Sequence, residues 1–546
     1  MTDYKALIQE HISSASHLSK RHVHPRLLSL FEVGGMNTAF TRGKDVYLFD
    51  SQGRRYLDFL AGGGVYFIGR NHPEVNSAMQ AVIESDLPNL CVVNASVLGG
   101  LLAERLLELA GPHLTKVLYA NSGTEATDVA VRFARVATGR RRYLYLEGAF
   151  HGRSYAAISM CGFEALRERQ EPLMPTCTPI PPNDIAALRR ELRRGDVAGF
   201  IFEPVQGMTT TVLDPGYLRE ARTLCDEYGT LMIADEVQTG LGRCGSWFAC
   251  QAAGVRADMV TVSKTLSGGA VPVSAVMMTE NVYESVYSKF TAGPIYFSTF
   301  AENNLAMAAG LATLKVLKDI DAPRRSEEIA RKLNEGIARL AAHYDVIEKV
   351  KGKGLMMSIY FRESQQVGLR IQQKIMNGFD TGSFAAAVNV EMYARQRIVV
   401  QIPGPGINAI KILPPIVTTD ADIEYFLAAF EDALATLYRS ATGPASTLGR
   451  GVLAQASKVV GGVLPKELTQ AIGNAVSGGG AASGSAAPAR PEHGARHFER
   501  PADAPPAERL FQRPSVGAYA DDPEHIPADV AMHTLLQADA NAAAGE

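Results

Sequence analysis

The amino-acid sequence predicts an α/β fold whose core is a parallel β-sheet. Two observations carry this prediction. Short, mostly apolar runs are typical of strands buried on both faces of such a sheet, and they alternate with helical patterns through residues 1–442. Alternation of this kind indicates an α/β architecture. The five clearest runs are residues 117–120, 143–146, 200–202, 231–234 and 259–262.

Residues 124–137 are predicted to form one of the intervening helices. Ala126, Val129 and Phe133 recur at helical spacing and define an apolar face. Gly139 follows as a stop signal.

The composition excludes several classes of protein. The chain has 546 residues, 46% of them hydrophobic, and 54 basic against 57 acidic residues leave a formal net charge of -3. This balance argues against nucleic-acid binding, which needs a basic excess or stripe. No uncharged apolar run reaches the roughly 20 residues of a membrane span. The six scattered cysteines are typical of reduced thiols and favour a cytoplasmic location, with no metal site expected.

The composition changes sharply near residue 443. The stretch from about 477 to 510 is rich in Gly, Ala, Ser and Pro, and it cannot bury enough apolar surface to offset the entropy lost on ordering. We therefore predict that residues 443–546 form a low-complexity, largely disordered tail. Binding of an unknown partner is an open role for it.

Ligands of parallel sheets gather at the carboxyl ends of the strands, so residues that directly follow the runs come first. Ser122, Gly123 and Thr124 follow the first run and open the predicted helix. A helix N-terminus with two hydroxyls and a glycine can cradle a phosphate. The alternative is that Ser122 is only an N-cap.

The second run is followed by Phe150 and His151, and the fourth is followed by an acid. Phe150 and His151 could place a flat ring against a planar cofactor, or be a core residue and a loop residue. Asp235 follows a buried strand, where a carboxylate is costly without a cationic partner or a metal. A metal-binding pair with Glu236 is disfavoured, because the chain has no G-x-x-x-x-G-K-[ST] loop.

Lys264 follows the last run and precedes a loop of small residues. Burial lowers the pKa of such an amine and makes it a nucleophile toward an aldehyde; a lysine that snorkels from a strand end is the alternative. The combination is more specific than its parts. A phosphate cradle, a stacking aromatic, a buried Asp and a buried Lys are what pyridoxal phosphate (PLP) requires, since the Asp keeps the pyridine nitrogen protonated and the Lys forms the Schiff base.

With these residues in place, the sequence resembles the class III PLP-dependent aminotransferases, which include ornithine, acetylornithine and 4-aminobutyrate aminotransferases. The resemblance covers approximately residues 20–440. Further motifs that carry it are YLFD (47–50), YLD (56–58), EPVQG (203–207), GLGR (240–243), STF (298–300) and GKGL (352–355).

The resemblance implies fold type I, in which a large domain with a mostly parallel seven-stranded sheet is joined to a smaller α+β domain. Residues 61–325 would form the large PLP-binding domain. Residues 1–60 and 326–442 would form the two parts of the small domain.

The resemblance also implies roles for individual residues. Lys264 would form the Schiff base and shuttle the proton, Asp235 would pair with the pyridinium nitrogen, and Gln238 would bond the ring hydroxyl. The remaining cofactor contacts would come from Phe150 stacked on the ring, His151 beside it, Ser122, Gly123 and Thr124 at the phosphate, and Thr299 contributed by the neighbouring subunit of a homodimer.

The implied reaction moves an amino group between an amine or ω-amino compound and a 2-oxo acid, aldehyde or ketone. Racemases, aminomutases and a decarboxylase of the same family remain alternatives, because Lys264 and Asp235 serve all of them. A catalytically retired scaffold protein is an alternative from another class.

The chain departs from the family on the substrate side, where Glu203, Met208 and Lys411 are the candidate residues. Lys411 stands where the family has an arginine that grips a substrate carboxylate, so the charge is kept but the bidentate fork is lost. Met208 replaces the acid that pairs with that arginine in some members, and removing both partners avoids an unpaired buried charge.

The third departure lies in the loop that includes Thr299. The family's His-x-x-Thr-Phe-Gly-Gly-Asn-Pro-Leu appears here as residues 296–305, YFSTFAENNL, without the two glycines and the proline. Together with Met208, the Tyr296–Phe297 pair motivates the hypothesis that the site accepts an apolar or bulky substrate better than a dicarboxylate.

Overall fold

A computed structural model describes residues 2–33, 36, 38–89, 95–287, 295–377 and 382–442. All of them belong to one unit of the chain, Met1–Gly480. The predicted tail, residues 443–546, lies outside the described residues.

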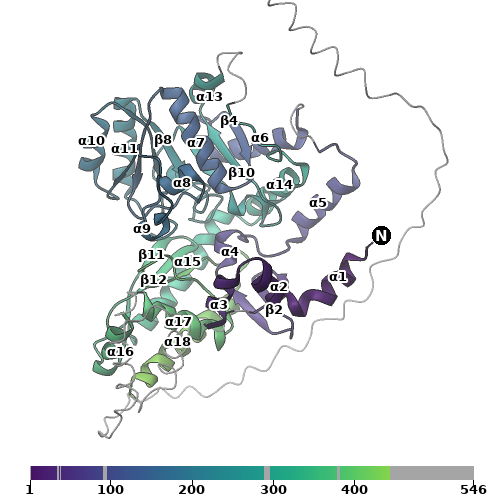
Figure 1. Ribbon diagram of the computed structural model, residues 1–546, viewed down its shortest axis with the longest axis vertical. Coiled ribbons are helices and arrows are strands. Elements are labelled where there is room, and N and C mark those ends of the chain that lie inside the picture. Colours follow the sequence, from purple (N-terminus) through teal and green to yellow (C-terminus); the bar gives the residue numbers. More distant parts are fainter. Residues whose placement is uncertain are drawn as a thin grey trace, which may run out of the picture. The chain divides into compact units, whose positions relative to one another are not determined.

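A seven-stranded sheet forms the centre of this unit (Figure 1). Six strands run in one direction, and β10 runs antiparallel to both of its neighbours. In order across the sheet, the strands are β4 (Lys116–Ala120), β10 (Ser274–Met278), β9 (Met259–Val262), β8 (Leu231–Asp235), β7 (Val197–Phe202), β5 (Arg142–Leu146) and β6 (Cys177–Ile180). The predicted mostly parallel sheet is thereby confirmed.

All five predicted runs fall inside strands of this sheet, because strands buried on both faces are apolar throughout. The sequence analysis missed β6 and β10. β6 contains Pro179 and occupies the edge of the sheet, where a missing N–H is tolerated but the sequence pattern is weak. β10 is apolar, but its reversed direction is a property of the topology and not of its residues.

Helix α7 (Gly123–Thr138) covers one part of the sheet and contacts β4, β7, β8, β9 and β10. The predicted helix, residues 124–137, is confirmed, and Gly139 ends it in the left-handed conformation with φ 67°. Figure 1 shows α10 (Ile185–Leu192) and α11 (Pro215–Tyr228) side by side. The other helical segments of residues 61–325 are α4 (Ala61–Gly64), α5 (Pro73–Glu84), α6 (Val97–Ala110), α8 (Tyr155–Ser159), α9 (Glu164–Arg167), α12 (Ala249–Ala252), η2 (Lys264–Ser267), α13 (Glu280–Tyr287) and α14 (Asn304–Asp319).

Two smaller sheets are built from the ends of the described chain. One has the order β1 (Phe40–Lys44), β2 (Tyr47–Asp50), β3 (Arg55–Asp58) and β13 (Ile398–Val399), and the other is β11 (Ile347–Lys353), β12 (Met356–Phe361) and β14 (Ala409–Ile412). The remaining helical segments are α1 (Tyr4–His11), η1 (Ile12–Ser14), α2 (Ala15–His22), α3 (Pro25–Val33), α15 (Ala322–Ala341), α16 (Val367–Asn377), α17 (Ser383–Ala394) and α18 (Asp420–Thr442).

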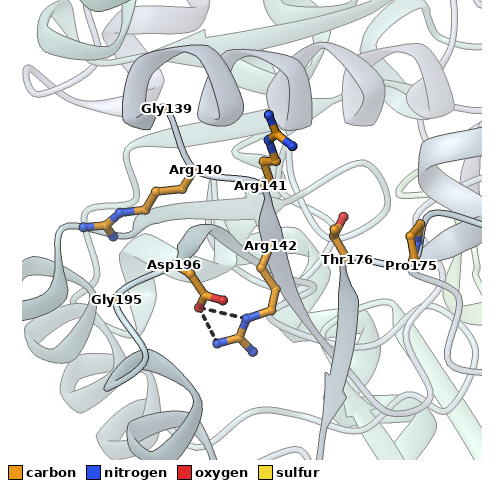
Figure 2. Close-up of a pocket in the computed structure, with 8 residues that line it drawn as sticks. All are labelled: Gly139, Arg140, Arg141, Arg142, Pro175, Thr176, Gly195 and Asp196. Carbon is orange, nitrogen blue, oxygen red and sulfur yellow. Dashed lines mark hydrogen bonds and ion pairs between the residues drawn. The ribbon is translucent and has the colours of Figure 1, made fainter.

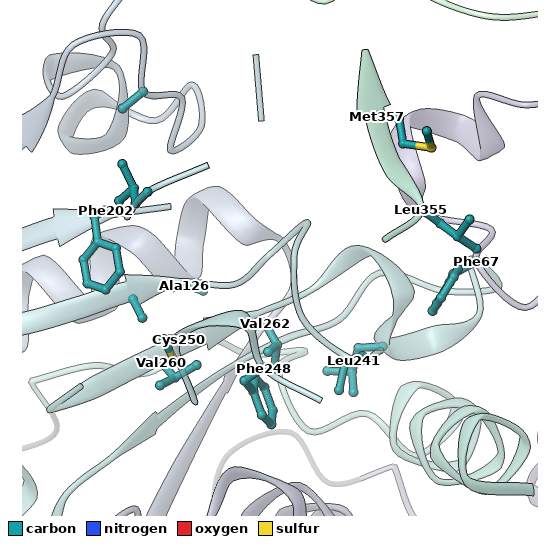
Figure 3. Packing of buried hydrophobic residues seen from close by; sticks show 14 of the residues in the cluster. Phe67, Ala126, Phe202, Leu241, Phe248, Cys250, Val260, Val262, Leu355 and Met357 are labelled. Atoms are coloured by element: carbon teal, nitrogen blue, oxygen red, sulfur yellow. The ribbon is translucent and has the colours of Figure 1, made fainter. Parts of the chain in front are cut away.

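One continuous hydrophobic core joins the seven-stranded sheet to the smaller sheets. Figure 3 shows Val260 and Val262 of β9 in the same cluster as Met357 of β12 and Leu355, which precedes that strand. β13 pairs with β3, so residues 341 positions apart share a sheet. The division into domains at residues 60/61 and 325/326 stays a prediction. No helix among the described residues has the length and apolarity needed to cross a membrane.

Candidate active site

The site lies where β8, β9 and the start of α7 meet. Asp235 is the last residue of β8, and Ser263 separates β9 from Lys264. A Cβ atom built on Gly123 would lie 2.9 Å from Val237 Cγ1 and 3.6 Å from Ser263 Cβ. The helix N-terminus therefore touches the chain two residues after Asp235 and one residue before Lys264. The strand-end residues that the sequence singled out are brought together.

Lys264 is half-buried and begins η2 with φ 36°, in the left-handed region that side chains rarely adopt. Burial lowers the pKa of its amine, and Arg243 acts in the same direction, while Asp235 and Glu203 oppose the shift. Within the described part of the chain, the amine makes no hydrogen bond and no ion pair. It is thus an amine without a hydrogen bond that lies within electrostatic range of two carboxylates.

The carboxylate of Asp235 is buried and bonded to His151 across the strand ends. Oδ2 lies 2.7 Å from His151 Nδ1, and Oδ1 accepts from the backbone N–H of Val237 at 3.1 Å. Burial opposes a charged His151 imidazole, but the bond to Asp235 and the nearby Glu203 outweigh it and raise the pKa of the ring. His151 Nε2 is buried without a partner among the described residues. His151 therefore orients Asp235, and the raised pKa of its ring favours the charged form that would pair with this carboxylate.

Glu203 follows β7 and holds two loops of the site. Its Oε1 accepts from the backbone N–H of Phe150 at 2.9 Å, and its Oε2 accepts from that of Gly207 at 2.6 Å. Burial raises the pKa of Glu203, and Asp235 adds to the shift. Glu203, which was predicted to contact the substrate, therefore bonds to the backbone in this structure and fixes the position of the loop that carries Phe150.

The start of α7 offers backbone N–H groups that could bind an anion. The first N–H groups of a helix have no intrahelical acceptor, and here they belong to Gly123 and Thr124. Ser122 is the N-cap and accepts from the backbone N–H of Glu125 at 3.4 Å; its contact with a phosphate stays a prediction. The Thr124 hydroxyl lies 2.7 Å from Ser154 Oγ and accepts from the backbone N–H groups of Arg153 and Ser154 at 3.0 and 2.9 Å.

Gln238 and Lys411 contact each other. Lys411 Nζ donates to Gln238 Oε1 at 2.6 Å and to the carbonyl of Gly207, and Gln238 Nε2 donates to the carbonyl of Gly63 at 2.8 Å. Burial lowers the pKa of Lys411 to about 7, and the charges of Lys264 and Arg243 add to this shift.

Sequence reasoning missed Arg243, although it belongs to a quoted motif. The side chain is fully buried and donates to the carbonyls of Pro414 at 2.7 Å and of Gly64 at 3.2 Å, with its guanidinium 4.0 Å from the Phe67 ring centroid. Burial lowers its pKa to about 9. The sequence offered one signal, an arginine in a glycine-rich motif. It did not show the role of Arg243, because the carbonyls that accept its hydrogen bonds lie far away in the sequence.

Thr299 and Phe300 are exposed on this chain. The preceding residue is placed near the start of α7, since Ser298 Oγ accepts from Asn121 Nδ2 at 2.8 Å. Contribution of Thr299 to the site of a second subunit stays a prediction.

Met208 belongs to an apolar wall that also includes Phe163 and Ile407. A Cβ atom on Gly404 would lie 2.8 Å from Met208 Cε, 3.3 Å from Ile407 Cδ1 and 3.6 Å from Phe163 Cε1. All three side chains are half-buried. Phe163 and Ile407 carried no signal in the sequence, because the wall forms only when three loops meet.

The loop that carries Phe150 depends on a close backbone contact at Gly162. A Cβ atom there would lie 2.1 Å from the backbone nitrogen of Gly148. We expect Gly162→Ala to lower the free energy of unfolding by about 1–3 kcal/mol, because the backbone must shift. Denaturant titration measures this. The control is Gly100→Ala in α6, where the added methyl meets open space and the helix should gain up to about 1 kcal/mol. Equal effects of the two changes would contradict the expectation.

Lys411 should make stability depend on pH. Between its folded pKa of about 7 and an unfolded value of about 10.4, the unfolded chain binds one more proton at this residue, so stability rises with pH, by up to about 1.4 kcal/mol per unit. Lys264, Glu203, Arg243 and Cys244 act on this charge. Denaturant titrations of cofactor-free wild type and Lys411→Met at pH 7 and 9 should therefore diverge in favour of the wild type at pH 9. A pH-independent difference would refute the shift.

A pocket of about 530 Å³ lies at the other end of the strands, where β5 begins. Figure 2 shows three consecutive arginines in its wall, with Arg142 bonded to Asp196. Arg140 donates to the carbonyls of Tyr228 and Gly229 at 2.7 and 2.9 Å. Two of the three cations are thus committed to the fold, and this pocket is separate from the site at the carboxyl ends.

The residues at the carboxyl ends fit PLP. The α7 N-terminus offers N–H groups for a phosphate, Asp235 offers a buried carboxylate for a pyridinium nitrogen, and Lys264 offers an amine without a partner. The fold and this donor set define a PLP-dependent enzyme of fold type I.

Comparison with known proteins agrees. The sequence model of the family described as "Aminotransferase class-III" matches residues 31–434, and the chain belongs to this family. It is therefore a PLP-dependent aminotransferase.

Solved structures with the same fold have related activities. The chain is similar to ornithine aminotransferase from Toxoplasma gondii (26% identity, TM-score 0.66, covering 74% of this chain and 91% of that one). It is also similar to an amine transaminase from an uncultivated Pseudomonas species (26%, 0.66, 73% and 95%). A third similar structure is acetylornithine aminotransferase from Elizabethkingia anophelis (28%, 0.60, 75% and 98%).

Proposed function

We propose that the chain transfers an amino group from an amine carrying an apolar substituent to a 2-oxo acid, with Lys264 as the residue that binds the cofactor and moves the proton. The observation that carries this proposal is the uncommitted amine of Lys264 within electrostatic range of Asp235 and near the start of α7. PLP, when bound, supplies an aldehyde and an electron-withdrawing ring.

The surrounding residues support these roles. The lowered pKa of Lys264 keeps a larger share of the amine neutral, as a nucleophile and a general base both require. His151 holds Asp235 by its Nδ1 atom, so the carboxylate is oriented before a pyridinium nitrogen arrives. Gly123 and Thr124 would hold the phosphate, and Phe150 the ring face.

The apolar wall of Phe163, Met208 and Ile407 supports the choice of amine. It lies beside the Phe150 loop, because the backbone N–H of Gly162 donates to the carbonyl of Ala149 at 2.8 Å. An apolar substituent gains by leaving water there, whereas a carboxylate loses hydration without a partner.

A homodimer and a cytoplasmic location belong to the same proposal. Phe297 and Phe300 are 48% and 60% exposed, as expected of residues that face a second subunit. The five described cysteines are free, which suits a reducing compartment.

The test is a transfer assay over matched amines. Hexylamine and 6-aminohexanoate are offered with pyruvate, and both the alanine and the aldehyde formed are measured. We expect stoichiometric transfer and a preference for hexylamine. Failure to form alanine and aldehyde in equal amounts with either amine would refute the reaction, and a preference for 6-aminohexanoate would refute the choice of amine.

A further inference from the structure

Lys411 occupies the place where an arginine would grip a substrate carboxylate. A residue with that role must present N–H groups to the space that the substrate enters. Only 3% of Lys411 is exposed, and every residue of β14 is buried. A second subunit could only cover it further.

The ammonium group also has few donors to spare. Lysine has three N–H donors, against five in arginine. Two of the three are committed, one to Gln238 Oε1 and one to the carbonyl of Gly207. One donor at most remains, and it cannot form the bidentate pair that recognises a carboxylate.

The charge of Lys411 is weak as well. Burial, Lys264 and Arg243 all disfavour the ammonium form, and its pKa falls to about 7. The charged form is therefore less favoured here than in an exposed lysine. An amine whose charged form is disfavoured attracts a carboxylate poorly but still bonds an amide oxygen and a carbonyl.

Its two bonds lead to the side chains proposed to contact the cofactor ring. The first reaches Gln238, whose Nε2 is held by the carbonyl of Gly63. The second reaches Gly207, whose N–H is bonded to Glu203, which in turn holds the backbone of Phe150. Gln238 keeps one amide N–H for a further acceptor, and its bonds to Lys411 and to the Gly63 carbonyl both bear on which way that N–H points.

We propose that Lys411 is a positioning residue that locks the orientation of Gln238, and that it does not anchor a substrate carboxylate. This inference rests on the proposed function, since the orientation of Gln238 matters only with a cofactor in the site. Recognition of the carboxylate of the 2-oxo acid substrate then depends on residues other than Lys411.

The experiment compares Lys411→Met, Gln238→Met and the double variant. The readouts are the dissociation constant of PLP from absorbance titration and the KM of each substrate for the loaded enzyme. We expect Lys411→Met to weaken PLP binding about 5- to 100-fold, because a buried amide oxygen loses its donor. The double variant should match Gln238→Met within about threefold, and the KM of pyruvate should change less than about threefold.

Lys349→Met is the matched control, because this lysine lies in the same three-stranded sheet with its side chain 48% exposed. It should alter neither readout. A rise of tenfold or more in the KM of pyruvate for Lys411→Met, with PLP binding unchanged, would overturn the inference. Additive losses in the double variant would also overturn it.

Two further measurements keep the outcome decisive. If Lys411→Met does not fold, Lys411→Gln replaces it, and Gln238→Met tests the contact from the other side. A wild type that binds no PLP or transfers no amino group refutes the proposed function itself, whereas an active, loaded wild type with a Lys411-dependent KM refutes this inference alone.

Discussion

Replacing Lys264 with alanine should lower the rate of amino transfer by at least about 10²–10⁴-fold, the contribution of a positioned acid–base group. Lys264 provides the amine without a partner at the point where the strand ends and α7 meet. Single-turnover measurement with a saturating amine isolates the step in which it acts. Borohydride reduction should attach PLP to the Lys264 peptide in the wild type, as judged by mass spectrometry, and to no peptide in the variant.

Lys315→Ala is the control for this prediction, since that lysine is exposed on α14 and pairs with Asp319. Its rate should equal that of the wild type. Full activity of Lys264→Ala, or attachment of PLP to a different lysine, would remove Lys264 from the mechanism.

Replacing Asp235 with asparagine should reduce both catalysis and stability. The charge that keeps a pyridinium nitrogen protonated is lost, so the transfer rate should fall by about 10²–10⁴-fold, on the scale of a positioned proton donor or acceptor. Removing one partner of a buried pair costs about 3–5 kcal/mol, and His151 Nδ1 lies 2.7 Å from this carboxylate.

The stability loss should depend on pH with a definite sign. Asp235 raises the pKa of His151 in the folded chain, so the folded state binds the proton more tightly than the unfolded state. This stabilisation is fully present below the unfolded value of about 6.5 and is lost as the pH rises through the folded pKa. Denaturant titration of Asp235→Asn should therefore show the largest loss at low pH.

The control removes a negative charge at the amino end of a strand, away from the site. Asp258 precedes β9 and pairs with Arg222 at 2.7 Å. Asp258→Asn should cost stability without changing the transfer rate. An Asp235→Asn enzyme as active as Asp258→Asn would exclude Asp235 from the reaction.

Much of the site was predictable because strand-end polar residues are conspicuous in the sequence. A buried parallel strand is apolar throughout, so Asp235 and Lys264 stand out directly after β8 and β9. Gly123 and Thr124 are recognisable as the first residues of an amphipathic helix. These signals are local, since each depends on a strand or helix pattern and the residue that ends it.

The contacts between these residues were not predictable. The bond from His151 to Asp235 spans 84 positions, and that from Lys411 to Gln238 spans 173. The sequence identified Lys411 as a cation in an arginine's place but did not indicate that Gln238 and the carbonyl of Gly207 accept its hydrogen bonds.

The sequence by itself determined the α/β architecture and the cofactor, and it indicated the residues proposed to carry the chemistry, because burial and periodicity act on neighbours along the chain. Only the tertiary structure decided how those residues are paired, which side chains form the apolar wall, and which donors remain for a substrate. Hydrogen bonds and burial depend on what approaches through space, and that depends on how distant loops meet.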